Sequence, residues 1–202
     1  MVKVGAVIFD WGGVLIENPA PGLMRYCTDA LGVSVERYVA AHRNFQDEFQ
    51  KGLIAEEVFW ARVCSELSCP GPAAKSLWGD AFRTVYQPRA EMFEMVRRLK
   101  QKGYRTGFLS NTEVPAMKYF HTLGYDMFDV IVFSCAEHTR KPERKIYELA
   151  TGKIGMTPTH SVFIDDSPVY IEGAQKAGLN TILFSSVAEV RDRLAEFGVA
   201  VD

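Results

Sequence analysis

Five short apolar segments, each bounded by polar or glycine-containing turns, constrain the fold of this chain more than any other feature. They are rich in Val, Ile and Phe, as buried strands are. The segments read VGAVIFD, RTGFLSN, VIVFSC, SVFIDD and NTILFS. The last four alternate with segments that have helical apolar spacing, 113–123, 142–154 and 168–177. This alternation predicts an α/β fold with a parallel five-stranded sheet and helices on both faces.

The connection between the first two predicted strands is far longer than a crossover requires. It is rich in helix formers and has apolar residues at helical spacing, for example at Leu23, Cys27 and Ala30. We therefore predict a small helical cap at 18–86, inserted into a Rossmann-like core formed by 1–17 and 87–202. The segment CPGPAAK is predicted as a turn between cap helices, and 91–100 as a core helix. A chain of 202 residues is long enough for this arrangement.

Polar residues follow four of the predicted strands. Because the carboxyl ends of parallel strands meet at one edge of the sheet, where ligands bind, these residues should converge. In chain order they are Asp10, Ser110, Asn111, Arg140, Lys141, Asp165 and Asp166. Taken singly, each has an ordinary explanation as a turn residue or a solvated charge. Their convergence at one edge favours a functional site.

The chemistry of these residues suggests a metal and a phosphate. Crowded carboxylates repel one another, and their oxygens select a hard cation such as Mg²⁺. Mg²⁺ takes further ligands from water and substrate phosphate. Ser110, Asn111 and Lys141 are the predicted phosphate-binding residues, because they offer hydrogen-bond donors and a positive charge. Pro142 is predicted in the first turn of a helix that begins just after Lys141, and Pro168 opens the next helix.

Four segments in this order, VIFDWGGVL, FLSNT, RKPE and VFIDDSPVYIEGAQKAGL, resemble the four motifs of the haloacid dehalogenase superfamily of phosphatases. The resemblance spans nearly the whole chain and implies a Rossmann-like core with a helical cap after the first strand. It also implies roles for individual residues. Asp10 would be the catalytic nucleophile and a metal ligand, while Ser110 and Lys141 would hold the transferring phosphoryl group. Asp166 would bind Mg²⁺ directly, supported by Asp165 and by the backbone carbonyl of Gly12.

The expected function is therefore that of a Mg²⁺-dependent phosphatase. Asp10 would attack the phosphorus of a small phosphorylated metabolite, and water would then hydrolyse the aspartyl-phosphate intermediate. Mg²⁺ and Lys141 would neutralise the charge on the transferring group. The substrate would be a phosphate monoester, with a sugar phosphate as one candidate.

The sequence departs from the superfamily pattern at Gly12. Most of these phosphatases have an aspartate there that protonates the leaving group, and such proton transfer is worth about 10² to 10⁴ in rate. Three explanations are open. The leaving group could need little protonation, which we favour; another residue, Glu17 or His42, could supply the proton; or the protein could be a catalytically weak binding module. Retention of Asp10, Ser110 and Lys141 argues against the third explanation.

A second enzyme class shares part of this pattern. Metal-independent 2-haloacid dehalogenases of the same superfamily use the equivalent aspartate to attack carbon, and they resemble this sequence around Ser110 and Lys141. Asp165 and Asp166 favour the phosphatase, because a dehalogenase has no need of a metal-binding pair.

Composition limits the partners. A net charge of -2 disfavours binding to nucleic acid, which depends on Lys and Arg neutralising phosphates. The chain has no apolar run of the length of a membrane span and no recognisable export signal, and its four cysteines are scattered. The expectation is a cytoplasmic monomer or homodimer without a membrane partner. Trp11, beside the nucleophile, could contact a substrate or fill the interface with the cap, and we favour the packing role. The sequence leaves open the orientation of four polar or amphipathic cap residues, Arg25, His42, Arg43 and Trp60.

Overall fold

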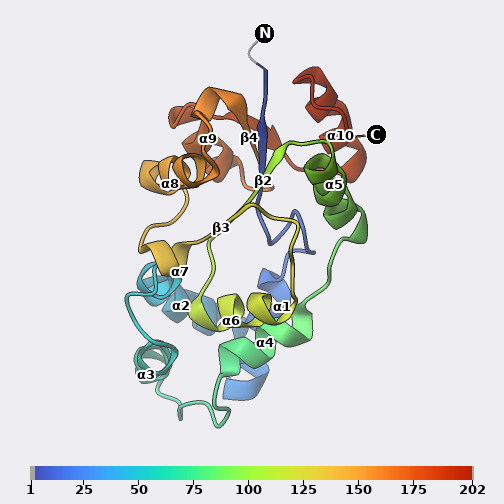
Figure 1. The fold of residues 1–202 in the computed structure, drawn as a ribbon. Helices are drawn as coiled ribbons and strands as arrows, with labels where there is room; N and C mark the ends of the chain where they lie inside the picture. Colours follow the sequence, from blue (N-terminus) through green and yellow to red (C-terminus); the bar gives the residue numbers. More distant parts are fainter. Residues whose placement is uncertain (1–2, 202) are drawn as a thin grey trace.

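The protein contains one parallel five-stranded sheet in the order β3-β2-β1-β4-β5 (Figure 1). The computed structural model describes residues 3–201. The strands are β1 (Ala6–Phe9), β2 (Arg105–Ser110), β3 (Val130–Phe133), β4 (Ser161–Asp165) and β5 (Asn180–Leu183). All four neighbouring pairs are parallel. The five predicted strands and the α/β class are confirmed.

The sheet has helices on both faces because side chains alternate along each strand. Val7 and Phe9 of β1 belong to the apolar cluster that includes residues of α5 (Ala90–Gln101), α6 (Val114–Thr122) and α10 (Val187–Glu196). Ala6 and Ile8 belong to a second cluster with residues of α8 (Arg144–Ile154) and α9 (Pro168–Lys176). All four residues of β1 are buried, as expected for the central strand.

Four helices lie between β1 and α5 in the chain and gather beyond the carboxyl ends of the strands (Figure 1). They are α1 (Ala20–Leu31), α2 (Val35–Gln50), α3 (Glu56–Leu67) and α4 (Leu77–Val85). All lie within the predicted cap, and the segment CPGPAAK connects α3 to α4. We refer to α1–α4 as the cap; its exact boundaries at 18 and 86 stay a prediction.

The helix that ends at Ile154 begins later in the sequence than predicted. α8 starts at Arg144, because Glu143 still has an extended backbone with φ -62° and ψ 130°. Pro142 therefore does not open the helix, and Lys141 lies in the loop before it. The short helices α7 (Ser134–Glu137) and η1 (Pro158–His160) complete the described secondary structure. Pro168 does open α9, as predicted.

Within residues 3–201, no helix combines the length and apolar composition needed to cross a membrane.

Candidate active site

The register of the sheet brings two of the predicted carboxylates together. Phe9 of β1 is paired with Ile164 of β4, so the next residues along each strand, Asp10 and Asp165, emerge side by side. The Asp10 N–H donates to the carbonyl of Ile164 at 2.9 Å and extends the ladder by one residue. Asp10, Asp165 and Asp166 each offer an oxygen within 4.8 Å of the others. The strand ends thus form the carboxylate cluster that the sequence predicted.

Lys141 lies between two of these carboxylates. Its Nζ is 2.7 Å from Oδ1 of Asp10 and 2.5 Å from Oδ2 of Asp165, and the side chain is 1% exposed. The same ammonium lies over the rings of Tyr170 and Phe163, at 4.9 and 5.3 Å from their centroids. Burial alone would lower the pKa of Lys141, but the two carboxylates hold it above its ordinary value. Lys141 is therefore a buried cation at neutral pH.

One ammonium does not balance the carboxylate charge. Burial raises the pKa of Asp10 to about 8; Lys141 opposes this rise and Asp165 adds to it. Burial and the neighbouring Asp165 also raise the pKa of Asp166. A further positive charge would stabilise both carboxylates in their ionised form. The donor set, composed of oxygens, fits a hard divalent cation.

Two of the three carboxylates are placed to bind such a cation. Asp165 already uses both oxygens: Oδ2 accepts from Lys141 and Oδ1 accepts from the backbone N–H of Ser167 at 2.8 Å. Asp165 thus serves as a support, which leaves oxygens of Asp10 and Asp166 for a metal. Gly13 has φ +88°, and a Cβ at this position would lie 2.0 Å from Oδ2 of Asp166. Glycine is required here because the backbone passes directly against this carboxylate.

The loop after β2 positions Ser110 and Lys141. Ser110 is buried, and its Oγ accepts from Oγ1 of Thr112 at 2.6 Å. The Asn111 side chain holds the backbone of Lys141 from both sides, accepting from its N–H at 2.8 Å and donating to its carbonyl at 3.0 Å. The Asn111 amide is therefore engaged with the Lys141 backbone. The second hydrogen of the amide nitrogen is not used by these bonds, and Asn111 lines the cavity, so its predicted contact with phosphate stays a prediction.

A cavity of about 380 Å³ lies between the carboxyl edge of the sheet and the cap. Its core wall includes Asp10, Ser110, Lys141 and Asp166, the residues that the sequence analysis expected to converge. The cap contributes an apolar side from α1 and a polar side from α2. These cap residues are Pro19, Ala20, Leu23 and Met24, and His42, Gln46 and Gln50. A concave site with few converging polar groups is typical of a small-molecule site.

A side chain at position 12, where the proton donor is expected, would pack tightly against Pro19. A Cβ on Gly12 would lie 3.0 Å from Cδ of Pro19, which leads into the cap. Glu17 is exposed and pairs with Arg89 through both carboxylate oxygens, at 2.9 and 2.7 Å, and it does not line the cavity. His42 does line the cavity, but burial lowers its pKa to about 4, so that it is neutral at pH 7. Neither candidate has the properties of a general acid at neutral pH.

Titration of His42 predicts how stability depends on pH. Its pKa falls from the ordinary value of 6.5 to about 4 on folding, first because of burial and second because of Arg43. Between these values the unfolded chain binds more protons, so the free energy of unfolding decreases as pH falls. Between pH 6.5 and about 4 we expect the free energy of unfolding of wild type to fall by up to about 3 kcal/mol more than that of His42→Phe.

Urea denaturation of both proteins at pH 7, 5.5 and 4.5 checks this expectation. His121→Phe, which alters an exposed histidine on α6, is the matched control and should retain the wild-type slope. Identical slopes in wild type and His42→Phe would contradict the burial of a neutral imidazole.

Glu113 is the main cavity residue that the sequence analysis missed. It is buried, lines the cavity, and accepts from Nε2 of Gln50 and Nε1 of Trp78, both at 3.0 Å. Burial raises the pKa of Glu113, while the hydrogen bonds from Gln50 and Trp78 lower it. In the sequence it stands directly before a helix, where an acidic residue is ordinary. No local signal distinguishes it, because its two partners come from the cap.

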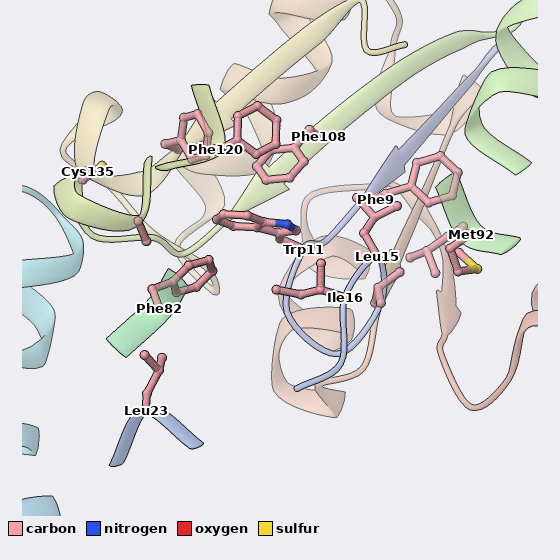
Figure 2. Close-up of a cluster of buried hydrophobic side chains, with 14 of the residues drawn as sticks. Phe9, Trp11, Leu15, Ile16, Leu23, Phe82, Met92, Phe108, Phe120 and Cys135 are labelled. Carbon is pink, nitrogen blue, oxygen red and sulfur yellow. The ribbon is translucent and has the colours of Figure 1, made fainter. Parts of the chain in front are cut away.

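Trp11 belongs to the interface between core and cap. It is 1% exposed, and its ring packs against Phe82 of α4 at a centroid distance of 4.7 Å. On the core side it contacts Phe108 and Phe120, at 5.7 and 5.3 Å (Figure 2). Its side chain therefore contributes to packing between the two parts. Trp60 is also buried and donates to Glu56 at 3.0 Å, away from the cavity.

The sheet topology and the covering helices define a Rossmann-like α/β fold with a carboxylate cluster at the carboxyl edge of its sheet. Residues 4–178 match the family model of the haloacid dehalogenase-like hydrolases, and the chain belongs to this family.

The relatives include proteins of different overall size. The chain is 31% identical over 195 residues to mouse Acyl-CoA dehydrogenase family member 10, covering 88% of this chain but only 17% of that protein. It is 27% identical over 177 residues to the sesquiterpene phosphatase astK of Aspergillus oryzae, covering 86% of each. Its fold is similar to that of a HAD family enzyme from Bacteroides thetaiotaomicron, crystallised with magnesium and inorganic phosphate. That match has a TM-score of 0.75 and 20% identity, and it covers 92% of this chain and 96% of the other.

Proposed function

We propose that this protein is a Mg²⁺-dependent phosphatase that hydrolyses a small phosphorylated metabolite through an aspartyl-phosphate on Asp10. The observation that carries the proposal is the position of Lys141, whose Nζ lies 2.7 Å from Asp10 and 2.5 Å from Asp165 in a cavity beneath the cap. The name of the Aspergillus relative, a phosphatase, supports the same reaction class.

In the first step an oxygen of Asp10 forms a bond to phosphorus as the bond to the leaving oxygen breaks. In the second, water adds to phosphorus, the bond to Asp10 breaks, and inorganic phosphate leaves with the carboxylate regenerated. Lys141 neutralises negative charge on the phosphoryl oxygens, and the Ser110 hydroxyl donates to one of them. Thr112 positions Ser110, and Asn111 positions the Lys141 backbone, each through its hydrogen bonds.

A magnesium ion fits the carboxylate cluster. Asp10, Asp166 and the carbonyl of Gly12 would hold it, with Asp165 as support. When bound, Mg²⁺ supplies positive charge that stabilises the phosphoryl group in the transition state. The raised pKa values of Asp10 and Asp166 support this assignment, because both carboxylates lack sufficient positive charge from the protein.

The lack of a proton donor at position 12 limits the leaving group. Pro19 lies against the position that a side chain on Gly12 would occupy, Glu17 pairs with Arg89, and His42 is neutral. We therefore expect the best substrates to release an oxygen that is stable as an anion, as acyl phosphates and anomeric sugar phosphates do. A metal-independent dehalogenase would have no use for Asp166, which supports the phosphatase over that alternative.

Removal of divalent metal tests the proposed function directly. The purified protein should hydrolyse p-nitrophenyl phosphate and acetyl phosphate with Mg²⁺ present. In excess EDTA we expect the rate to fall roughly a hundredfold or more, because the negative charge at the carboxylate cluster then goes uncompensated. Readdition of Mg²⁺ in excess over EDTA is the control and should restore the rate. Equal turnover in EDTA would exclude the metal-dependent mechanism, and no turnover with Mg²⁺ would exclude the phosphatase.

A further inference from the structure

Two residues on the cap side of the cavity each have a buried polar atom without a hydrogen-bond partner. Nε2 of His42 and Oε1 of Gln50 have none among residues 3–201. Both residues belong to α2 and line the cavity, and His42 is 5% exposed. They are two helical turns apart on one face of α2, with Gln46 between them, so their side chains lie along the same wall. A buried polar group without a partner is unfavourable, and a ligand that supplies the missing hydrogen bond would offset this cost.

Glu113 of the core fixes the orientation of Gln50. Its carboxylate accepts from Nε2 of Gln50 at 3.0 Å, and a carboxylate can only accept. The amide nitrogen of Gln50 must therefore face Glu113, which leaves Oε1 as the free acceptor. Ser134 also fixes Gln50, because its Oγ donates to the Gln50 backbone carbonyl at 2.6 Å. Gln50 is thus held by the core through both its side chain and its backbone.

The Glu113 carboxylate also helps to position His42, because it binds Trp78, whose ring contacts the imidazole. The second oxygen of Glu113 accepts from Nε1 of Trp78 at 3.0 Å. The Trp78 ring stacks on the imidazole of His42, with centroids 5.4 Å apart and planes 12° from parallel. Phe59 packs edge-on against the same imidazole at 5.5 Å. The ring of His42 is therefore held in place by aromatic neighbours, and Nε2 is left without a protein partner.

The two free atoms select the chemistry of their ligand. Gln50 Oε1 needs a donor, which excludes a carboxylate or a second phosphate. Neutral His42 either donates or accepts at Nε2, depending on its tautomer. A hydroxyl group both donates and accepts at one oxygen, so it can donate to Gln50 Oε1 and accept from His42 in the tautomer that carries its proton on Nε2, whereas an ammonium group cannot accept. The opposite wall of the cavity, with Ile16, Leu23 and Met24, suits the carbon skeleton that carries this hydroxyl.

We propose that His42 and Gln50 form a subsite for a hydroxyl group on the organic part of the substrate, with Glu113 as a positioning residue. This inference rests on the proposed function and narrows it. The substrate is a phosphate ester of a hydroxylated carbon skeleton, with the phosphate toward Asp10 and a hydroxyl toward α2. The leaving group is thus recognised by the cap although position 12 provides no proton for it.

Turnover of matched ester pairs tests the subsite. Straight-chain diol monophosphates, from propanediol to hexanediol, are compared with alkyl phosphates of the same length, using the full chain with Mg²⁺. Both esters of a pair release a similarly poor leaving group, so both are slow substrates and their ratio reports recognition of the hydroxyl alone. At one or more lengths we expect kcat/KM to favour the diol ester by about tenfold to a hundredfold. His42→Phe, which keeps a ring against Trp78, and Gln50→Leu should each bring this ratio close to unity. His121→Phe and Gln101→Leu, which alter exposed positions on α6 and α5, are the matched controls.

The positioning role of Glu113 has its own readout. Glu113→Gln keeps the shape of the side chain but replaces one carboxylate oxygen by an NH₂ group. The variant therefore presents a donor in place of an acceptor to either Gln50 or Trp78. It should raise KM for the preferred diol ester and leave KM for the matching alkyl ester unchanged. A merely structural role would raise both values together, and that result would overturn the assignment of Glu113.

Binding to Asp10→Asn separates this inference from the proposed function. Calorimetry with the same ester pairs reports the subsite whether or not the chain turns them over. If Asp10→Asn binds a diol ester more tightly than the matching alkyl ester, and the double variant Asp10→Asn with Gln50→Leu does not, the subsite is supported even if no ester is hydrolysed. Equal binding at every length would mean that His42 and Gln50 hold only water, and the subsite would be rejected even if both esters are hydrolysed.

Discussion

Asp10→Asn should abolish the hydrolysis of p-nitrophenyl phosphate and acetyl phosphate, with a fall in kcat on the order of 10³ or more. The amide has nearly the shape of the carboxylate but is a far weaker nucleophile. The substitution also removes a charge that contacts Lys141 at 2.7 Å. Asp165 is not placed to substitute for Asp10, because both of its oxygens are engaged, by Lys141 and by the Ser167 backbone.

Steady-state kinetics at saturating Mg²⁺ measure this effect, and circular dichroism verifies that the variant is folded. Mass spectrometry of acid-quenched wild type during acetyl phosphate turnover should find phosphate on the peptide that contains Asp10. Asp126→Asn, at an exposed position outside the cavity, is the matched control and should retain wild-type kcat. If Asp10→Asn turned over at the wild-type rate, Asp10 would not be the nucleophile.

Lys141→Met should destabilise the fold by about 3 to 5 kcal/mol. The lysine is 1% exposed, and its removal leaves the buried carboxylates of Asp10 and Asp165 without their shared cation. Methionine fills much of the same volume, so lost charge accounts for most of the expected change. Since Asp10 and Lys141 compensate each other, the double variant with Asp10→Asn should be more stable than Lys141→Met alone.

Urea denaturation at pH 9 without divalent metal measures these free energies of unfolding, because the pKa of Asp10 is raised to about 8 and its carboxylate is ionised above this pH. Lys176→Met is the matched control, because Lys176 makes an exposed pair with Glu172 on α9 and its loss should leave stability unchanged within error. A Lys141→Met variant as stable as wild type would show that the two carboxylates are protonated in the folded protein, and that Lys141 is not their charge partner.

Charge and hydrogen bonding give the two sides of the cavity different chemical roles. The core side concentrates carboxylates around Lys141, which suits a metal and a phosphoryl group. The cap side is uncharged at His42 and Gln50 and suits a neutral group on the same substrate. Substitutions on the core side should therefore affect turnover of every substrate, while those on α2 should mainly change the preference among substrates.

Much of the core site could be predicted because it depends on strand order and on the residues at the carboxyl end of each strand. A buried parallel strand leaves a clear mark in the sequence, and parallel strands bring their carboxyl ends to one edge. That rule accounts for the convergence of Asp10, Ser110, Lys141, Asp165 and Asp166. The start of α8 was predicted incorrectly. Pro142 predicted a helix start, but the backbone of Glu143 is extended and the helix begins at Arg144.

The polar contacts on the cap side of the cavity could not be predicted from strand order and local patterns. Glu113 contacts Gln50 and Trp78 across 63 and 35 residues of chain, and no periodic pattern specifies such partners. The two hydrogen bonds of Asn111 to the Lys141 backbone likewise join residues 30 positions apart and have no signal in the sequence. The sheet, the helices of the long insertion and the meeting of the carboxylates could be predicted, because they depend on local hydrophobic periodicity and on strand order. The polar atoms that remain free to bind a ligand could be identified only in the folded protein, because they depend on how the inserted helices pack against the core.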